Sequence, residues 1–550
     1  MPPDTDVARK QIEDEIEQHL KAVVVLKRRL NTTVAISRLP NELLAEIFVW
    51  LAQDYYDYSK KLLGPYSNSY GTYSTSYGTN LRWIRTSHVC HTWREVALTT
   101  PRLWSFIQVA RQEAIEMLLV RSKQAPLLVC MGQSPYRKKS IEVLGELLPP
   151  ETCRLREVYL DGSARDIYNL CTNFTQPANL LHVLNLSGSQ SHYSVNSSPP
   201  PLPRHLFGGQ FPRLRNLELH QIAFSWDNPV FCKTLTNLVV IGGSYSGSFE
   251  QLLYVLEQMT ELENLVLEDV VPSTGNHTTS LPPPSHPIML PRLRDIWLCR
   301  LAIDTANLLR HLSPAIDTEL VIATKHGHGG LSDLVAALES HLDQTRPVRT
   351  AYLAQIYRTQ LNISAWPEDI GFHKSINYLS DYRAPFRLEL EVDNSFVACQ
   401  RLIGDSLLFS TVRCLEVETG RNQSWAWEHI ISGMPNLRIL GVLSGVEDSF
   451  LDALCVAHPA ANGDVPSLVL PHLEVLSFSN TRLGLNAKHM EGKDFKDRLV
   501  DCLILRCNYN LPVQEVHLTY CRNTTVDDVD RLREVVPEVV WDGDEEFEEV

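Results

Sequence analysis

The sequence predicts a small helical unit at the N-terminus, followed by a long α/β (or α+β) solenoid built from repeats. Three observations support this fold class. The chain has 550 residues, which is too long for one compact core. The short segment Ile36–Ala52 is apolar around more than one helical face. A six-residue apolar pattern recurs from about residue 150 to the end of the chain.

Residues 5–31 are predicted to form one charged helix. Its apolar residues recur at steps of three and four, as on one face of a helix, at Ile12, Ile16, Leu20, Val23, Leu26 (or Lys27) and Leu30. Two interpretations stay open. The helix is either a coiled-coil segment, for which about three heptads is short, or a helix that packs on its own domain.

The next segment reads "ISRLPNELLAEIFVWLA" and predicts a helix over Pro40–Ala52. Proline suits the first turn of a helix, where its missing N–H has no partner to lose. Because apolar residues nearly ring this helix, something must cover it, either the chain itself or a partner. Residues 54–80 follow, with seven tyrosines among Ser, Thr, Gly and Asn. We interpret them as a mobile low-complexity loop, with a tyrosine-rich ligand site as the alternative.

Residues 81–109 predict two helices with a break near Ser87–His88, and Pro101 ends the second helix. From about residue 150 the pattern L-x-x-L-x-L, which is typical of a leucine-rich repeat, occurs ten times. The segments are Leu155–Leu160, Leu181–Leu186, Leu214–Leu219, Leu235–Val240, Leu262–Leu267, Leu293–Leu298, Val412–Val417, Leu437–Val442, Leu473–Phe478 and Val513–Leu518. The L-x-L half predicts a short strand, and each unit buries its apolar face only by stacking on a neighbour.

Apolar segments between these strands predict helices, for example over Phe249–Met259 and Leu331–Leu342. The interval from 299 to 411 is expected to hide degenerate units near Thr318–Ala323 and Phe386–Val392. Residues 542–550 form an acidic tail, predicted to be solvated, with docking as the alternative.

Composition excludes several functional classes. The net charge of −15 and the lack of a basic cluster argue against nucleic-acid binding. The N-terminus has no apolar segment of the signal-peptide type, and no apolar run is long enough to span a bilayer. The twelve cysteines are scattered without a C-x-x-C motif, as in reduced intracellular proteins. We therefore expect a cytoplasmic or nuclear protein that binds no membrane.

The sequence offers no catalytic or cofactor motif, so we expect no enzyme, no cofactor and no metal. "KHGHGG", Lys325–Gly330, places two histidines two residues apart, but two ligands alone do not make a metal site. Cys90 and His91 are adjacent on a predicted helix and therefore point about 100° apart, which excludes a catalytic dyad. Cys90 is expected to be a core residue.

Three motifs together resemble an F-box: "LPNELLAEIF" (Leu39–Phe48), "VCHTWREVA" (Val89–Ala97) and "PRLW" (Pro101–Trp104). In particular, the chain resembles the F-box-like proteins of mushroom-forming (basidiomycete) fungi, which combine this motif with irregular leucine-rich repeats. The chain departs from the family in the long insertion at 54–80. The predicted organisation is an N-terminal helix (5–31), an F-box-like domain (36–106), a connecting segment (107–149), a repeat solenoid (150–541) and the acidic tail (542–550).

The resemblance implies a three-helix unit that binds the Skp adaptor of a cullin-based ubiquitin ligase, while the repeats bind an unknown protein target. The adaptor contacts that it implies are Leu39, Pro40, Leu43, Ile47 and Trp93. The target-facing candidates, beside the core leucines, are Glu157, Asn185, Glu218, Trp297 and Glu416. The alternative is a repeat scaffold with a helical cap and no ligase. The adaptor contacts would be exposed in the first case and buried against the solenoid in the second.

Overall fold

The computed structural model of the chain describes residues 3–61, 81–108, 112–131, 137–189, 200–273, 286–315, 317–325, 330–342, 347–356, 360–370, 384–391, 406–419, 425–446, 448–458, 467–483 and 494–543. The chain divides into two compact units, Met1–Ser246 and Gly247–Val550. Both units combine helices with a mostly parallel sheet, which confirms the predicted mixed α/β character. Within the described ranges, no helix is both long and apolar enough to cross a membrane.

The first unit begins with helices and continues as alternating strands and helices. Its α-helices are α1 (Pro3–Asn31), α2 (Asn41–Lys61), α3 (His91–Thr99), α4 (Gln112–Ser122), α5 (Arg137–Leu147) and α6 (Ala164–Thr172). Its 3₁₀ helices are η1 (Ala35–Arg38), η3 (Leu81–His88), η4 (Pro101–Trp104), η5 (Pro149–Arg154) and η6 (Leu206–Gly209). Its strands are β1 (Phe106–Gln108), β2 (Leu127–Met131), β3 (Leu155–Ser163), β4 (Val183–Ser189), β5 (Asn216–His220), β6 (Phe224–Ser225), β7 (Asn237–Ile241) and β8 (Tyr245–Ser246).

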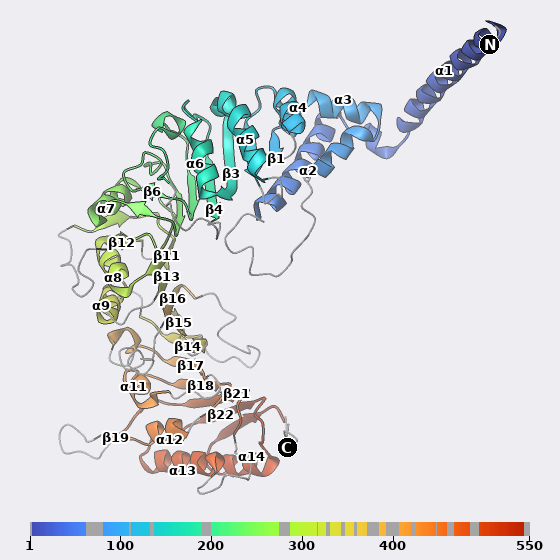
Figure 1. Ribbon diagram of the computed structural model, residues 1–550. Helices are drawn as coiled ribbons and strands as arrows, with labels where there is room; N and C mark the ends of the chain where they lie inside the picture. Colours follow the sequence, from blue (N-terminus) through green and yellow to red (C-terminus); the bar gives the residue numbers. More distant parts are fainter. Residues whose placement is uncertain are drawn as a thin grey trace. The chain divides into compact units, whose positions relative to one another are not determined.

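The sheet of the first unit runs in chain order, β1-β2-β3-β4-β5-β7, and every pairing is parallel. Helices α4, α5 and α6 lie along one side of its first strands (Figure 1). The interval 107–149, which the sequence predicts as a connection, itself contributes β2, α4 and α5 to this arrangement. Short strands β6 and β8 form a separate parallel pair.

The second unit has the same alternation over a longer stretch. Its helices are α7 (Phe249–Gln258), α8 (Ala302–His311), α9 (Leu331–His341), η8 (Leu407–Phe409), α11 (Trp427–Ser432), α12 (Asp448–Leu454), α13 (Phe495–Asn508) and α14 (Val526–Arg533). Its main strands are β9 (Asn264–Glu268), β11 (Asp295–Arg300), β13 (Glu319–Thr324), β14 (Thr350–Ile356), β15 (Gln360–Trp366), β16 (Phe386–Glu391), β17 (Cys414–Glu418), β18 (Ile439–Leu443), β21 (Val475–Ser479), β22 (Glu515–Thr519) and β23 (Glu538–Trp541). Two small sheets pair β10 (Ile288–Leu290) with β12 (Leu312–Pro314), and β19 (Ala457–His458) with β20 (Ser467–Leu468).

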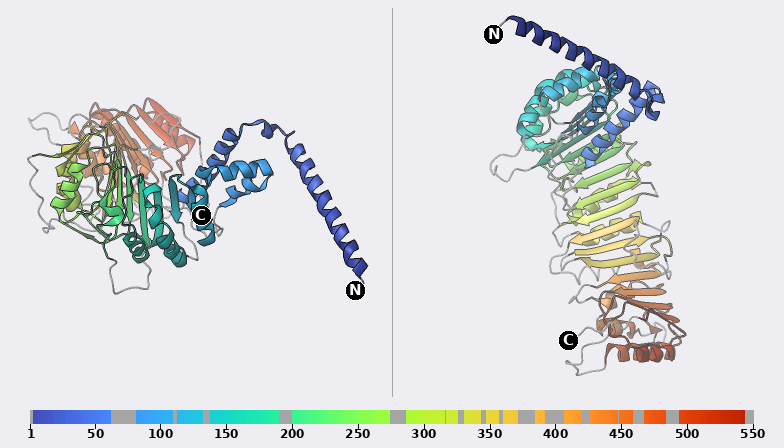
Figure 2. Two further views of the ribbon diagram at one scale, coloured as in Figure 1. Left: turned by 90° about the horizontal axis from the view of Figure 1, so that it is seen from above. Right: turned by 90° about the vertical axis from the view of Figure 1, so that its right-hand side faces the viewer.

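In all ten segments with the L-x-x-L-x-L pattern, the L-x-L half lies on a strand of these sheets, as predicted. Their three apolar positions are at most 3% exposed in every segment. Equivalent positions also pair in register, since Val158 lies beside Leu184, Leu184 beside Leu217, and Leu217 beside Leu238. In the first unit, the stacked strands therefore build a continuous apolar row. The right-hand view of Figure 2 shows a stack of strands in the second unit as well.

The interval between residues 299 and 411 departs from a simple parallel series. Strands β13 and β16 lie where degenerate units are predicted. Between β13 and β17, however, the strand order is β13-β16-β15-β14-β17, and β15 is antiparallel to both of its neighbours. The sequence did not predict this reversal, because an alternating strand carries no sign of its direction in a sheet.

The N-terminal helix extends from Pro3 to Asn31, which confirms the predicted helix. The prediction that helix α2 ends at Ala52 is wrong, since it continues to Lys61 and takes up the first residues of the predicted loop. The rest of that loop (62–80), the two histidines of "KHGHGG" and residues 544–550 of the acidic tail lie outside the described residues.

A fully buried arginine connects three segments of the second unit. Arg506 on α13 is 0% exposed. Its guanidinium donates hydrogen bonds to the carbonyl oxygens of Leu454 (3.4 Å), Val469 (3.0 Å) and Leu470 (2.6 Å). Burial lowers the pKa of this guanidinium. Without these donors, three carbonyl groups at the end of α12 and before β21 lose a hydrogen-bond partner.

Replacing Arg506 with methionine is expected to lower the free energy of unfolding by about 3 kcal/mol, because buried carbonyl groups lose their donors. The matched control is Arg533→Met, which removes an exposed pair with Asp530 and is expected to change stability by less than about 0.5 kcal/mol. Urea denaturation of both variants measures the difference. Equal shifts would contradict the structural role of Arg506.

Candidate functional site

Helix α2 has two apolar faces. The buried face repeats every fourth residue and packs into the first unit, through Leu44, Phe48, Ala52 and Tyr56 together with Val49. This spacing places the four side chains on one side of a helix, because 3.6 residues make one turn. A normal amphipathic helix would carry polar residues on its remaining surface.

The second apolar face of α2 is exposed. Leu43 is 53% exposed, Ile47 46%, Trp50 72% and Leu51 37%. Ile47 follows Leu43 by four residues and precedes Trp50 and Leu51 by three and four. Residues three or four apart are neighbours on a helix, so all four lie on one side of it. We call these four residues the α2 stripe. Ile36 and Leu39, which precede α2, are exposed as well.

An aromatic core holds α2 against the helices that follow it. The ring of Phe48 lies 5.1 Å from that of Trp93 on α3, measured between centroids. The rings of Trp83 and Trp104 lie 5.4 Å apart, edge to face. The indole N–H of Trp104 donates a 2.7 Å hydrogen bond to the carbonyl oxygen of Ala97, which fixes η4 against the end of α3. The α2 stripe therefore lies on a helix that is packed against its neighbours.

The C-terminal end of α2 packs on the first strands of the sheet. Tyr56 is 0% exposed, and its ring contacts those of Phe106 on β1 (5.6 Å) and Tyr159 on β3 (6.4 Å). Lys60, one turn further, forms ion pairs with Asp57 (2.7 Å) and Glu157 (3.4 Å). Burial alone would lower the pKa of Lys60, but the two carboxylates have a larger opposite effect, so the pKa of Lys60 is raised overall. The helical unit and the sheet thus share one core in the first unit.

A comparison with protein-family models finds the F-box-like family over residues 36–108. The chain therefore carries an F-box-like domain. The match covers the predicted range 36–106 and includes α2, η3, α3, η4 and β1. A search of curated proteins finds no match.

The structure exposes most of the adaptor contacts that the resemblance implies. Leu39, Pro40, Leu43 and Ile47 are exposed, and Trp93 is half-buried beside Phe48. Trp50, the most exposed member of the α2 stripe, is not among the predicted adaptor contacts. Its step of three residues from Ile47 was the available signal. Cys90, expected in the core, is half-buried at the start of α3, and His91 is exposed.

The target-facing candidates are less accessible than the stripe. In the first unit the structure brings together Asn185 and Glu218, which are register partners on β4 and β5 and share a hydrogen bond. Glu157 pairs with Lys60 of α2. In the second unit Trp297 is half-buried, and Glu416 is only 1% exposed. Asn185, Glu218 and Glu157 are therefore engaged in contacts within the chain.

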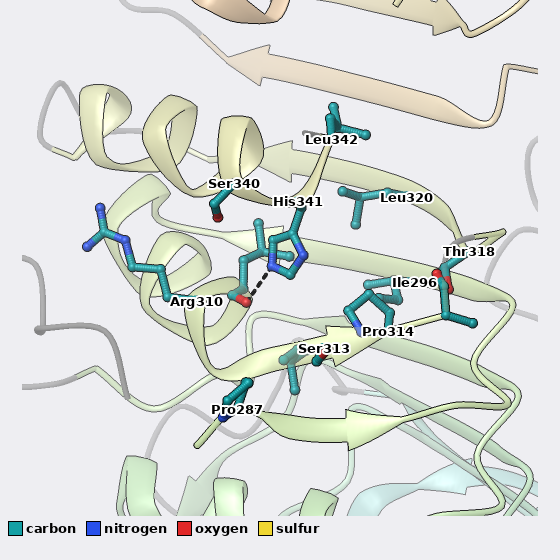
Figure 3. Close-up of a pocket in the computed structure, with 13 residues that line it drawn as sticks. Pro287, Ile296, Arg310, Ser313, Pro314, Thr318, Leu320, Ser340, His341 and Leu342 are labelled. Atoms are coloured by element: carbon teal, nitrogen blue, oxygen red, sulfur yellow. Dashed lines mark hydrogen bonds between the residues drawn. The ribbon is translucent and has the colours of Figure 1, made fainter. Parts of the chain in front are cut away.

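The second unit contains a cavity of about 330 Å³ beside helices α8 and α9 (Figure 3). In its wall, the imidazole Nε2 of His341 lies 2.6 Å from the carbonyl oxygen of Leu309, and burial lowers the pKa of this ring. The guanidinium of Arg310 lies 3.3 Å from the carboxylate of Asp333. These groups fix α9 against α8. Among the described residues, no three His, Cys, Asp or Glu side chains are grouped so that they could hold a metal ion.

Truncation of Tyr56 tests the shared core of the F-box-like domain and the sheet. Tyr56→Ala is expected to lower the free energy of unfolding by about 3–5 kcal/mol, because it removes a buried aromatic ring. The phenol oxygen has no hydrogen-bond partner among the described residues, so Tyr56→Phe is expected to change stability by less than about 1 kcal/mol. Chemical denaturation measures both. A small effect of the alanine variant would contradict this packing.

Proposed function

We propose that this chain is a non-catalytic substrate-recognition adaptor of a Skp-cullin-F-box type ubiquitin ligase. The observation that carries the proposal is the exposed α2 stripe on a domain that matches the F-box-like family. Aliphatic and aromatic anchors in a patch that becomes desolvated supply most of the energy of a protein interface. A buried stripe would have favoured a capping role instead.

The proposed mechanism is proximity. The F-box-like domain holds a Skp-type adaptor and, through it, a cullin ligase, while the remaining chain holds a protein target. The target's lysines then meet the conjugating enzyme at a high effective concentration, and no chemical step falls to this chain. We propose that the chain carries out this role in the cytosol or the nucleus.

We further propose that the sheets form an irregular leucine-rich-repeat solenoid, as in the basidiomycete proteins that the sequence resembles. The in-register apolar rows support this proposal, since one strand-helix unit cannot bury such a row alone. A backbone bond repeats from strand to strand as well: the amide of His182 donates to Arg156, that of Arg215 to His182, and that of Thr236 to Arg215. The solenoid would offer the target its strand surface, where Trp297 and Glu218 retain partial exposure.

Copurification with a Skp adaptor tests the proposal. Wild-type protein is expected to bind, and Leu43→Asp/Ile47→Asp is expected to lose at least about 100-fold in affinity, because two anchors of the stripe become charged. The matched control is Val120→Asp, which charges an exposed apolar residue of α4 outside the stripe. Thermal denaturation should give the same midpoint for all three proteins.

Two outcomes would contradict the proposal. If folded wild-type protein does not bind the adaptor, the chain is a repeat scaffold whose helical unit acts as a cap. If Leu43→Asp/Ile47→Asp binds as tightly as the wild type, the α2 stripe is not the adaptor surface.

A further inference from the structure

Helix α1 is an exposed helix with an unpartnered apolar face. Every described side chain from Asp6 to Asn31 is exposed. Its large apolar side chains are 45–67% exposed, at Val7, Ile12, Ile16, Leu20, Val23, Val24, Val25, Leu26 and Leu30. Most of the stability of a helix in a protein comes from packing of its apolar face. Helix α1 has 29 residues, and the pair of Arg9 with Glu13 (3.0 Å) lies within the helix itself. We therefore expect another protein surface to pack against its apolar face.

The spacing of these residues fits the seam of a two-stranded coiled coil. In a heptad frame, Ile16, Val23 and Leu30 occupy a positions, and Ile12, His19 and Leu26 occupy d positions. Five of these six positions are aliphatic, as the buried seam of a coiled coil requires. His19 supplies the one polar position of this seam, and a single polar residue tends to fix the register of a coiled coil.

Charge is separated along α1. Its first half carries mostly acidic side chains, namely Asp4, Asp6, Glu13, Asp14, Glu15 and Glu17, beside Arg9 and Lys10. Its second half carries only basic ones, namely Lys21, Lys27, Arg28 and Arg29. Two copies in a parallel arrangement would place the acidic halves at one end of the pair and the basic halves at the other. Two copies in an antiparallel arrangement place the acidic half of one helix beside the basic half of the other.

We propose that α1 mediates self-association of this chain as an antiparallel two-stranded coiled coil. In this register Ile16 faces Leu26 of the second copy, and Leu30 faces Ile12. Val23 faces His19. Each of these three facing pairs is one layer of the seam, and two-fold symmetry repeats each layer once, so the seam contains six layers.

The flanking positions complement this register. At the e positions Glu13 faces Lys27 of the second copy, and at the g positions Glu15 faces Arg29. Symmetry doubles both, which gives four pairs of opposite charge. At the centre Leu20 meets Leu20 and Ala22 meets Ala22, which extends the apolar contact. In a parallel pair, Glu15 would face Leu20 and Ala22 would face Lys27, so neither contact would be an ion pair.

This surface is distinct from the α2 stripe and does not depend on the adaptor role. A dimer through α1 would join two F-box-like domains and two sheet regions in one particle. Two target-binding regions in one particle raise the effective concentration for a target that carries two epitopes. The seam is short, so we expect a reversible dimer whose population rises with protein concentration.

Sedimentation equilibrium of the full-length chain tests the proposal. The wild type is expected to be a reversible dimer. E13K/E15R makes the four flanking positions basic, and K27E/R29E makes them acidic. Each variant is expected to raise the dissociation constant on the order of 100-fold, because attractive pairs become repulsive. An equimolar mixture, and the fourfold exchange E13K/E15R/K27E/R29E, are expected to restore association.

Cysteine cross-linking determines the orientation. A22C is expected to form an intermolecular disulfide under mild oxidation, since position 22 faces itself in the antiparallel register. I16C is not expected to do so, because the two copies of position 16 lie about 15 Å apart along the axis. Wild-type protein gives the background from native cysteines.

A monomeric wild type would overturn the proposal, as would unchanged association of the two charge variants. Cross-linking of I16C but not A22C would show a parallel pair and overturn the antiparallel register. Because the substituted side chains are exposed, the variants should keep the wild-type thermal midpoint and adaptor binding. Failure of the adaptor proposal would leave these results unaffected.

Discussion

In-register strand pairing is the constraint on which both sheets depend. Val158, Leu184, Leu217 and Leu238 occupy equivalent positions on adjacent strands, so each is covered by residues distant in the sequence. A shift of one residue would turn an entire row to the opposite face of the sheet. The apolar spacing therefore fixes the register, and the register fixes which side chains remain at the surface. In the second unit, Arg506 donates hydrogen bonds to carbonyl groups at the end of α12 and before β21. Burial would otherwise leave these carbonyl groups without these donors.

Helix α2 connects this framework with function, because it is apolar on two sides. One side ends in Tyr56, which packs on β1 and β3 and anchors the F-box-like domain to the sheet. The other side, the α2 stripe, leaves between 37% and 72% of each side chain exposed to solvent. Its apolar side chains are therefore available to a partner. The rigid aromatic core below them limits the ordering cost of binding.

Helix α1 presents a different kind of surface from the α2 stripe. The stripe is a short row of large side chains that includes Trp50, as suits a groove on a partner of different sequence. The face of α1 is a longer heptad seam, flanked by separated charges that complement a second copy of itself. The two surfaces lie on different helices, so binding at one does not require the other. Together they give the proposed adaptor both a ligase contact and a means of bivalency.

The sequence by itself determined the helices of the N-terminal region, the strands that carry the apolar pattern, and the identity of the F-box-like segment. It could do so because period, capping residues and short motifs are local properties. Tertiary structure decided the rest. It placed Tyr56 in a core although its neighbours suggested a loop, and it reversed β15. It also buried Glu416 and left Trp50 exposed. Burial and strand direction depend on which distant segments become neighbours, and local spacing carries no information on that.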